Sequence, residues 1–352
     1  MAGGTMRALS RLARAVGACI VVVMIAGSEC GAPAPVPVVP DQVESWNPGT
    51  TGPGGAAGGN ADAATDEHAQ VGYSSLLLDG VASGVGGDFD IYDAAGRELL
   101  SGGHAPEQPV AVAPGTYVLT QAGNPAFVFA SAVAVEADRL TVVAVGAIRL
   151  VLVEGATRGW FDLYDASGRA VLSQANEPDL PVTAPAGTYV LKQSFNEAFT
   201  FAESVAVQAG ATTTVRLGAV RLETVAGAAG GQFDIYGPDG TVLLAEANEP
   251  DVPVAVPPGT YVLKRYFNDR LVLAAGVTVA AGQSTVIRMG ALRYNGAVAY
   301  DLYLGNNLVV PSCLPGELQT IPPGTYSLYE YFSDRLLASG VVVQPGQITE
   351  VE

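Results

Sequence analysis

Short runs of alternating apolar and polar residues follow one another from about Ser74 to the C-terminus, with turn residues between them. The clearest stretch, Gly146 to Leu217, contains about seven such runs of strand length. No part of it shows the 3.6-residue period of an amphipathic helix. Short alternating strands separated by frequent turns are typical of an antiparallel β-sandwich, so the pattern predicts an all-β fold of the immunoglobulin-like kind.

A short phrase ending in Gly-Thr-Tyr recurs four times, which shows that the chain is a tandem array. Its glycines, spaced 72, 72 and 65 residues apart, are Gly115, Gly187, Gly259 and Gly324. Residues 161–222 align with residues 233–294 without gaps and share half of their residues. We therefore predict four small sandwich repeats of about 72 residues. Their predicted boundaries are 74–145, 146–217, 218–289 and 290–352.

The repeats follow one another without a linker. Residues 212–217 form a predicted strand that runs directly into Gly218, and the same happens at Gly146 and Gly290. We expect the last strand of one repeat to become the first strand of the next, with the glycine where backbones approach closely. A seven-residue strand spans roughly 23 Å, so four repeats placed end to end would form a stiff rod of about 100 Å.

The N-terminal part of the chain has a different composition. Three arginines precede fourteen uncharged residues, Ala15 to Ser28, a pattern that predicts a signal peptide over residues 1–29. Residues 30–73 are rich in Pro, Gly and Ala, which predicts a disordered tether. Cys30 follows the signal directly, as the acylated cysteine of a lipoprotein does, although Glu29 departs from that pattern. Lipid anchoring through Cys30 and plain secretion both stay open.

The net charge of the chain limits the classes of molecule that it can bind. The net charge is −17, and three of the 17 basic residues lie in the predicted signal peptide. An acidic, lysine-poor surface cannot neutralise phosphates, so nucleic acid is excluded as a partner. The same surface disfavours an anionic membrane, which leaves an N-terminal lipid as the only expected membrane contact.

The sequence resembles a family of bacterial envelope repeats. The residues that carry the resemblance are the turn-and-strand phrases Pro257 to Leu263 and Pro322 to Leu328, and the closing strands Val277 to Gly282 and Val341 to Gly346. In these the array is similar to PEGA-type and prealbumin-like (carboxypeptidase-regulatory-like) repeats, although the Pro-Glu-Gly-Ala tetrad is missing. The resemblance implies a non-catalytic extracytoplasmic sandwich.

The Gly-Thr-Tyr phrase also has a structural explanation of its own. A tyrosine that follows a turn between two sheets can bury its ring and hydrogen-bond back to the turn, as in a tyrosine corner. We therefore interpret Tyr189 and Tyr261 as structural residues.

Two turns could supply oxygen ligands to calcium. The sequence Asn-Glu-Pro-Asp occurs in repeats 2 and 3 and contributes Asn176, Glu177, Asp179, Asn248, Glu249 and Asp251. Carboxylate and amide oxygens are the ligands that calcium prefers. The alternative is a turn that uses Asn and Pro to enter a strand. No other cofactor is expected.

Aromatic residues mark three hairpin tips. The tip residues are Phe195, Tyr266, Phe267, Tyr331 and Phe332. Alternation would place one ring of each pair inside and the other outside, so exposed rings could stack on sugars. The alternative is cross-strand pairing within the hairpin.

Nothing in the sequence indicates catalysis. It contains two histidines, no phosphate-binding glycine loop and no nucleophile motif, so we expect that the protein is not an enzyme. The leading hypothesis is an exported envelope protein, periplasmic, outer-membrane-anchored or at the cell surface. It would act as a structural, spacer or adhesion module that contacts other envelope proteins. The alternative hypothesis is a carbohydrate-binding array that uses the hairpin-tip aromatics to bind polysaccharide.

Overall fold

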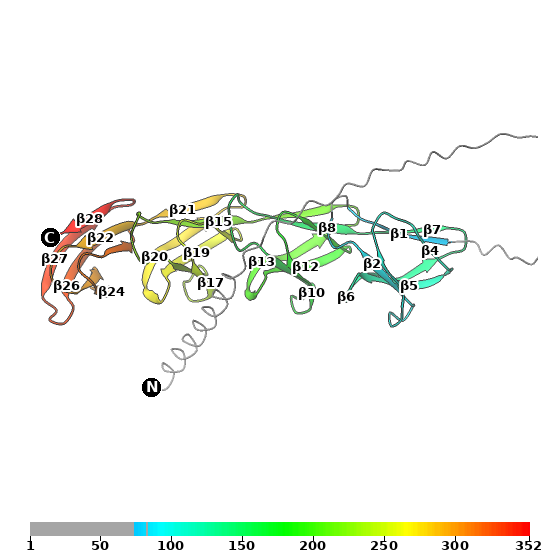
Figure 1. The fold of residues 1–352 in the computed structure, drawn as a ribbon, viewed down its shortest axis with the longest axis horizontal. Coiled ribbons are helices and arrows are strands. Elements are labelled where there is room, and N and C mark those ends of the chain that lie inside the picture. The colour runs from blue at the N-terminus through cyan, green and yellow to red at the C-terminus, as the bar shows by residue number, and fades with distance from the viewer. Residues whose placement is uncertain (1–73, 82–83) are drawn as a thin grey trace, which may run out of the picture. The chain divides into compact units, whose positions relative to one another are not determined.

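The computed structural model describes residues 74–81 and 84–352. The predicted signal peptide (1–29), the predicted tether (30–73) and Cys30 lie outside the described residues. Within the described residues all regular structure is β-strand, 28 strands in total (Figure 1). No helix in this part of the chain is long and apolar enough to cross a membrane.

The strands form four repeats, and each repeat is a pair of sheets. The prediction of an all-β tandem array of four small sandwiches is thereby confirmed. Repeat 1 contains β1 (Ser74–Asp79), β2 (Phe89–Tyr92), β3 (Leu99–His104), β4 (Val110–Val112), β5 (Gly115–Gln121), β6 (Asn124–Val135) and β7 (Leu140–Ala144). Repeat 2 contains β8 (Gly146–Val151), β9 (Phe161–Tyr164), β10 (Val171–Asn176), β11 (Pro181–Ala184), β12 (Gly187–Gln193), β13 (Asn196–Val207) and β14 (Thr212–Arg216).

Repeats 3 and 4 have the same order of strands. Repeat 3 contains β15 (Gly218–Glu223), β16 (Phe233–Tyr236), β17 (Leu243–Asn248), β18 (Val254–Val256), β19 (Gly259–Arg265), β20 (Asn268–Val279) and β21 (Ser284–Arg288). Repeat 4 contains β22 (Gly290–Tyr294), β23 (Tyr300–Leu304), β24 (Asn307–Cys313), β25 (Leu318–Ile321), β26 (Gly324–Glu330), β27 (Leu336–Val343) and β28 (Ile348–Val351).

Each sandwich packs a three-stranded sheet against a four-stranded one. In repeat 2 the sheet orders are β11-β8-β14 and β10-β9-β12-β13, and the other repeats have the equivalent orders. Alternate side chains of both sheets enter one continuous core, in which Phe161, Leu163 and Leu191 are fully buried. The alternation read from the sequence therefore corresponds to the inner and outer faces of the strands.

One pairing in each repeat is parallel, which the antiparallel prediction did not include. The first and last strands lie side by side in the same direction, as in β8 and β14, where Thr212 to Arg216 pair with Ala147 to Val151. All other ladders within the repeats are antiparallel. Because β14 runs in the same direction as β8, the chain leaves the sheet at the end opposite to its entry, and the next repeat can begin there.

The connection between repeats is one residue long. The expected continuous strand is instead two strands in different sheets, because Leu217 separates β14 from β15. Leu217 is fully buried, its N–H donates to Val151 O (3.0 Å), and its carbonyl accepts from Gly282 N (2.8 Å). Val145 and Met289 make the equivalent pairs of bonds at the other two connections. A single residue is thus hydrogen-bonded to the repeat before it and to the repeat after it.

The expectation of a glycine at this crossing is confirmed. A Cβ on Gly218 would lie 2.4 Å from Ala280 O and 2.3 Å from Val279 Cγ1. Gly146 and Gly290 are equally close to their own repeats. No side chain fits, because the turn before the last strand packs directly on the glycine.

The tyrosine corner is also confirmed, in all four repeats. The hydroxyls of Tyr117, Tyr189, Tyr261 and Tyr326 donate to the carbonyl four residues earlier, at 2.6 to 2.7 Å. Burial raises the pKa of Tyr189 and of Tyr261 to about 12. These tyrosines hold the turn between the two sheets.

Candidate functional site

The hairpin tips carry the most exposed aromatic side chains. Ser194 and Phe195 form the two-residue turn between β12 and β13, and Phe195 is 97% exposed. Its φ is +64°, a backbone region that costs a non-glycine residue roughly 1 to 2 kcal/mol. Phe267 occupies the same place in repeat 3 with φ +61°, and repeat 1 has Gly123 there with φ +72°. Two repeats thus hold a bulky ring at a position that suits glycine.

The tyrosines beside these rings are only half-buried. Tyr266 packs on Phe267 with ring centroids 3.8 Å apart, and Tyr331 packs on Phe332 with centroids 4.4 Å apart. Phe267 is 64% exposed and Phe332 is 91% exposed. Each pair lies within the turn rather than on a strand, so the two rings touch each other instead of facing opposite sides of a sheet.

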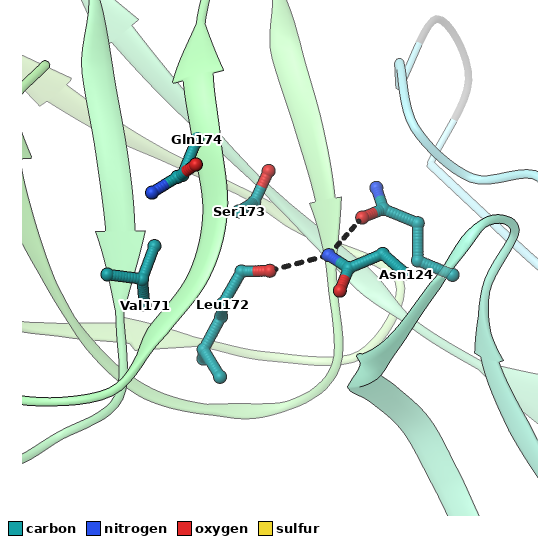
Figure 2. Close-up of a pocket in the computed structure, with 6 residues that line it drawn as sticks. Asn124, Val171, Leu172, Ser173 and Gln174 are labelled. Atoms are coloured by element: carbon teal, nitrogen blue, oxygen red, sulfur yellow. Dashed lines mark hydrogen bonds between the residues drawn. The ribbon is translucent and has the colours of Figure 1, made fainter.

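The residue after the tip reaches the next repeat. Asn124 Nδ2 donates to Leu172 O of repeat 2 at 2.7 Å (Figure 2). Asn196 and Asn268 make the same bond to Leu244 O and Val309 O, also at 2.7 Å. The three hairpins therefore lie at the junctions between repeats.

A polar pocket lies at the first of these junctions. Figure 2 shows Asn124 facing β10, with its amide bonded to Leu172 O and to Gln121 Oε1. The rest of the lining is Val171 to Gln174. The pocket is open to solvent and is formed by two repeats together.

A loop makes the second contact of each junction. The segment between the first two strands of repeat 2 forms a parallel bridge between Thr157 and Val254 of β18. Thr157 N donates to Pro253 O (2.9 Å) and Thr157 O accepts from Ala255 N (3.0 Å). Val85 makes this contact with β11, and Ala229 makes it with β25. Each loop thus extends the three-stranded sheet of the following repeat by one residue.

The turns considered for calcium use their side chains within the fold. Asn248 is fully buried and donates to Phe233 O (3.0 Å), and Asn176 donates to Phe161 O (3.1 Å). Asp251 accepts from the backbone and hydroxyl of Thr224, at 3.0 and 2.8 Å.

The remaining members of these turns also differ in their surroundings. Asp179 accepts weakly from Leu152 N (3.4 Å), Glu249 accepts from Gln232 Nε2 (2.7 Å), and Glu177 is exposed. Among residues 74–81 and 84–352, no group of three His, Cys, Asp or Glu residues is arranged to hold a metal ion. Calcium binding at these turns stays a prediction.

The junction between repeats 3 and 4 contains a polar cluster that sequence reasoning missed. Arg265 at the end of β19 donates to Gln319 Oε1 of repeat 4 at 3.3 Å. Burial lowers the pKa of Arg265, and the nearby Cys313 partly opposes this shift. Burial raises the pKa of the Cys313 thiol to about 12, so the thiol is protonated at neutral pH. The available signal was the replacement of Gln193 in repeat 2 by Arg265 in repeat 3.

Comparisons with known proteins give little support to any assignment. No protein-family model matches the chain, and no curated protein matches it. Among solved structures, a Bacillus anthracis TIE protein matches with 12% identity and a TM-score of 0.16, covering 69% of this chain and 54% of that one. The chain thus spans about half the length of that protein.

Two further solved structures are similarly distant. The pilus adhesin SpaC from Lactobacillus rhamnosus GG has 11% identity and a TM-score of 0.16, over 68% of this chain and 46% of that one. A leucine-rich repeat protein from Bacteroides thetaiotaomicron has 17% identity and a TM-score of 0.12, over 39% and 26%. Likeness at this level carries no argument about function.

Proposed function

We propose that the protein is a non-catalytic spacer and interaction module that is exported to the cell envelope. The observation that supports this function is the junction between repeats. Three contacts recur at every connection: the bridging residue such as Leu217, the loop bridge such as Thr157 to Val254, and the asparagine bond such as Asn196 to Leu244. A chain whose repeats only needed to be connected would not need three fixed contacts at each connection.

The N-terminal sequence supports the export part of this proposal. A signal peptide at 1–29 and a tether at 30–73 would place the array outside the cytoplasm, either secreted or anchored through Cys30. The partners would then be envelope proteins, and the acidic surface keeps the array soluble there.

The experiment removes one repeat from the full-length chain. Deleting residues 146–217 joins Val145 to Gly218 and recreates a junction of the same kind, so the remaining repeats should fold. The maximum dimension measured by small-angle X-ray scattering should fall by roughly 23 Å, the length of one repeat strand. An unchanged maximum dimension would show that the repeats do not act as spacers.

A second function, binding of carbohydrate, is favoured by the hairpin tips. Phe195 and Phe267 keep a costly positive φ while exposing most of the ring, and a residue held in such strain often has a role outside the fold. A neighbouring polar side chain such as Asp269 would hydrogen-bond to the hydroxyls of a sugar that stacks on the exposed ring.

The test compares two variants of the full-length chain. Phe195→Gly and Phe267→Gly together relieve the strained φ and should leave the fold intact, as Gly123 does in repeat 1. Co-sedimentation with insoluble polysaccharide should be lost in this variant if the rings bind glycans. Substituting Val242, an exposed apolar residue outside the tips, by Ala is the control, and retention of both proteins or of neither would argue against this function.

A further inference from the structure

Repeats 1 and 4 differ in the surfaces that they present, and the contacts at the internal junctions show what each surface could bind. At each internal junction the following repeat presents the same acceptor face. This face consists of the outer edge of its short strand, β11, β18 or β25, and one carbonyl of the neighbouring sheet, that of Leu172, Leu244 or Val309. The preceding repeat covers the face with its loop and its asparagine.

Repeat 1 has the same acceptor face, and no other repeat within the described residues covers it. The residues equivalent to Val182, Thr183 and Leu172 are Val110, Ala111 and Leu100, each 72 positions earlier. No residue of the described part of the chain bridges β4 on its outer edge.

The side chains of β4 are less buried than those of the equivalent strands in the other repeats. β18 and β25 are buried along their whole length, and β11 is buried at all but its first residue. In β4, Ala111 is exposed and its two neighbours are only half-buried. Leu100 is 50% exposed, whereas Leu172 and Leu244, which lie at internal junctions, are less exposed. An apolar side chain and an unpaired strand edge therefore lie together on the surface of repeat 1.

Repeat 4 lacks the parts that would fill such a face. Five residues (295–299) connect its first two strands, whereas nine (224–232) connect them in repeat 3. Ser333 stands where the other repeats have asparagine, and its hydroxyl bonds to Glu330 of its own hairpin. Repeat 4 therefore has neither the loop nor the amide of a donor.

We infer that the outer face of repeat 1, formed by β4 and Leu100, is an open acceptor for a β-sandwich repeat of the same kind carried by a different protein. A second copy of this chain does not fit this role. The donor parts of repeats 1 to 3 are engaged within the chain, and repeat 4 lacks them. The inference rests on the proposed function as an interaction module and names the class of its partner.

The internal junctions specify what the partner must present. An extended loop would donate one backbone N–H to Pro109 O and accept from Ala111 N, as Thr157 does with Pro253 and Ala255. A side-chain amide would donate to Leu100 O, as Asn196 does to Leu244 O. Apolar atoms of the same repeat would cover Leu100.

The experiment gives the donor parts to repeat 4 of the full-length chain. Residues 295–299 are replaced by the sequence of residues 224–232, and Ser333→Asn restores the amide. This grafted chain should associate head to tail, so its weight-average mass in sedimentation equilibrium should rise with concentration. The unmodified chain should stay monomeric over the same range.

Ala111→Pro in the grafted chain is the matched control. In β11 and β18 the equivalent N–H points outward to the loop, so proline at this edge position removes that donor and no ladder bond within the repeat. It should abolish the association. A monomeric grafted chain, association that survives Ala111→Pro, or association of the unmodified chain would each overturn the inference.

A second measurement uses the unmodified chain, in case the grafted chain does not fold. A synthetic peptide of residues 224–232 should slow hydrogen exchange of the Ala111 amide while leaving the Thr183 amide, which is already bonded to Val85 O, unchanged. No protection of Ala111 by the peptide would also count against the inference. These experiments measure contact between chains, so their failure is separate from a failure of the spacer test, which measures distance within one chain.

Discussion

At each junction one side chain, at the end of the strand before the hairpin, hydrogen-bonds to the neighbouring loop, hairpin or repeat; we call it the closing side chain. It is a glutamine at the first two junctions and an arginine at the third. Gln193 Nε2 donates to Arg158 O (2.9 Å), and its Oε1 accepts from Asn196 (3.0 Å), so one amide ties the loop to the hairpin. Gln121 does the same in repeat 1. Arg265 has only donors and cannot accept from Asn268. It reaches across to Gln319 of the next repeat instead.

The loop has changed together with this side chain. Gly230 of repeat 3 lies where a Cβ would be 1.8 Å from Arg265 Nη2, and repeat 2 has Arg158 at the equivalent position. The guanidinium of Arg158 donates a hydrogen bond to Ala247 O of repeat 3 (3.1 Å). Both junctions therefore contain a guanidinium, supplied once by the loop and once by a strand.

The difference shows which parts of a junction are interchangeable. The backbone bridge, the asparagine and the junction glycine occur at all three connections, whereas the closing side chain varies. Arg265 carries a desolvation cost, because its buried Nη1 has no hydrogen-bond partner among the described residues. Substitution of a charged side chain should consequently change the stability of the third junction more than that of the other two.

The largest effect is expected where all junctions are alike. Gly218→Ala should destabilise the protein by about 3 kcal/mol, because its Cβ would overlap a backbone carbonyl that cannot move aside. Guanidinium denaturation should show the loss. Gly237→Ala is the control, since its Cβ would meet nothing closer than 3.9 Å, and equal stability of the two variants would show that the close packing is unimportant.

A smaller effect of opposite sign is expected at the closing side chain. Arg265→Gln should stabilise the junction between repeats 3 and 4 by about 1 kcal/mol, because it removes a partly desolvated charge and restores an acceptor for Asn268. Gln193→Arg should destabilise repeats 2 and 3, where Arg158 already supplies a guanidinium. Denaturation midpoints of both variants measure the contrast, and a loss of stability in Arg265→Gln would contradict the comparison.

The asparagines should show a finer difference. Asn196 makes two hydrogen bonds, to Leu244 O and Gln193 Oε1, whereas the single bond found for Asn268 is to Val309 O. Asn196→Ala should therefore cost about 1 kcal/mol more than Asn268→Ala. The exposed Glu203→Ala on the same strand, β13, is the neutral control. Equal costs at the two asparagines would mean that the glutamine contributes nothing.

The smallest effect is a loss of stability at alkaline pH, which we expect at the third junction through the thiol of Cys313. The pKa of Cys313 rises from 9.0 to about 12 on folding, chiefly through burial. The unfolded chain therefore loses this proton first, and stability from the thiol is complete below pH 9 and lost as pH rises from 9 towards 12. Cys313→Ser should lose less stability than the unmodified chain over this range in denaturation measurements. Parallel pH profiles for the two proteins would show that the thiol is not the cause.

Local features of the fold could be predicted from the sequence because they depend on neighbouring residues. The turn glycines Gly96, Gly168 and Gly240 have φ between +67° and +69°, as their Asp-x-x-Gly or Pro-Asp-Gly turns predict. The tyrosine corners follow equally from a four-residue phrase.

Features that depend on distant residues could not be predicted in the same way. The bridge from Thr157 to Val254 joins residues 97 positions apart through backbone groups, which every sequence has. The parallel pairing of β8 with β14 depends on where the chain must leave the sheet, and strand composition does not record direction. The exchange of Arg158 and Arg265 between loop and strand was readable only by comparing repeats position by position.

The parallel first and last strands also determine how the array responds to tension. Stretching the chain pulls β1 from its N-terminal end and β7 from its C-terminal end, and these are opposite ends of one ladder of five paired residues. The force therefore acts along the strands and loads all the hydrogen bonds of the ladder at once, in shear. It does not break them one after another, as peeling one strand from the other would. Each repeat carries an equivalent parallel ladder between its points of attachment, with five paired residues in repeats 1 to 3 and four in repeat 4. An array fixed at one end and pulled at the other would therefore resist extension at every repeat.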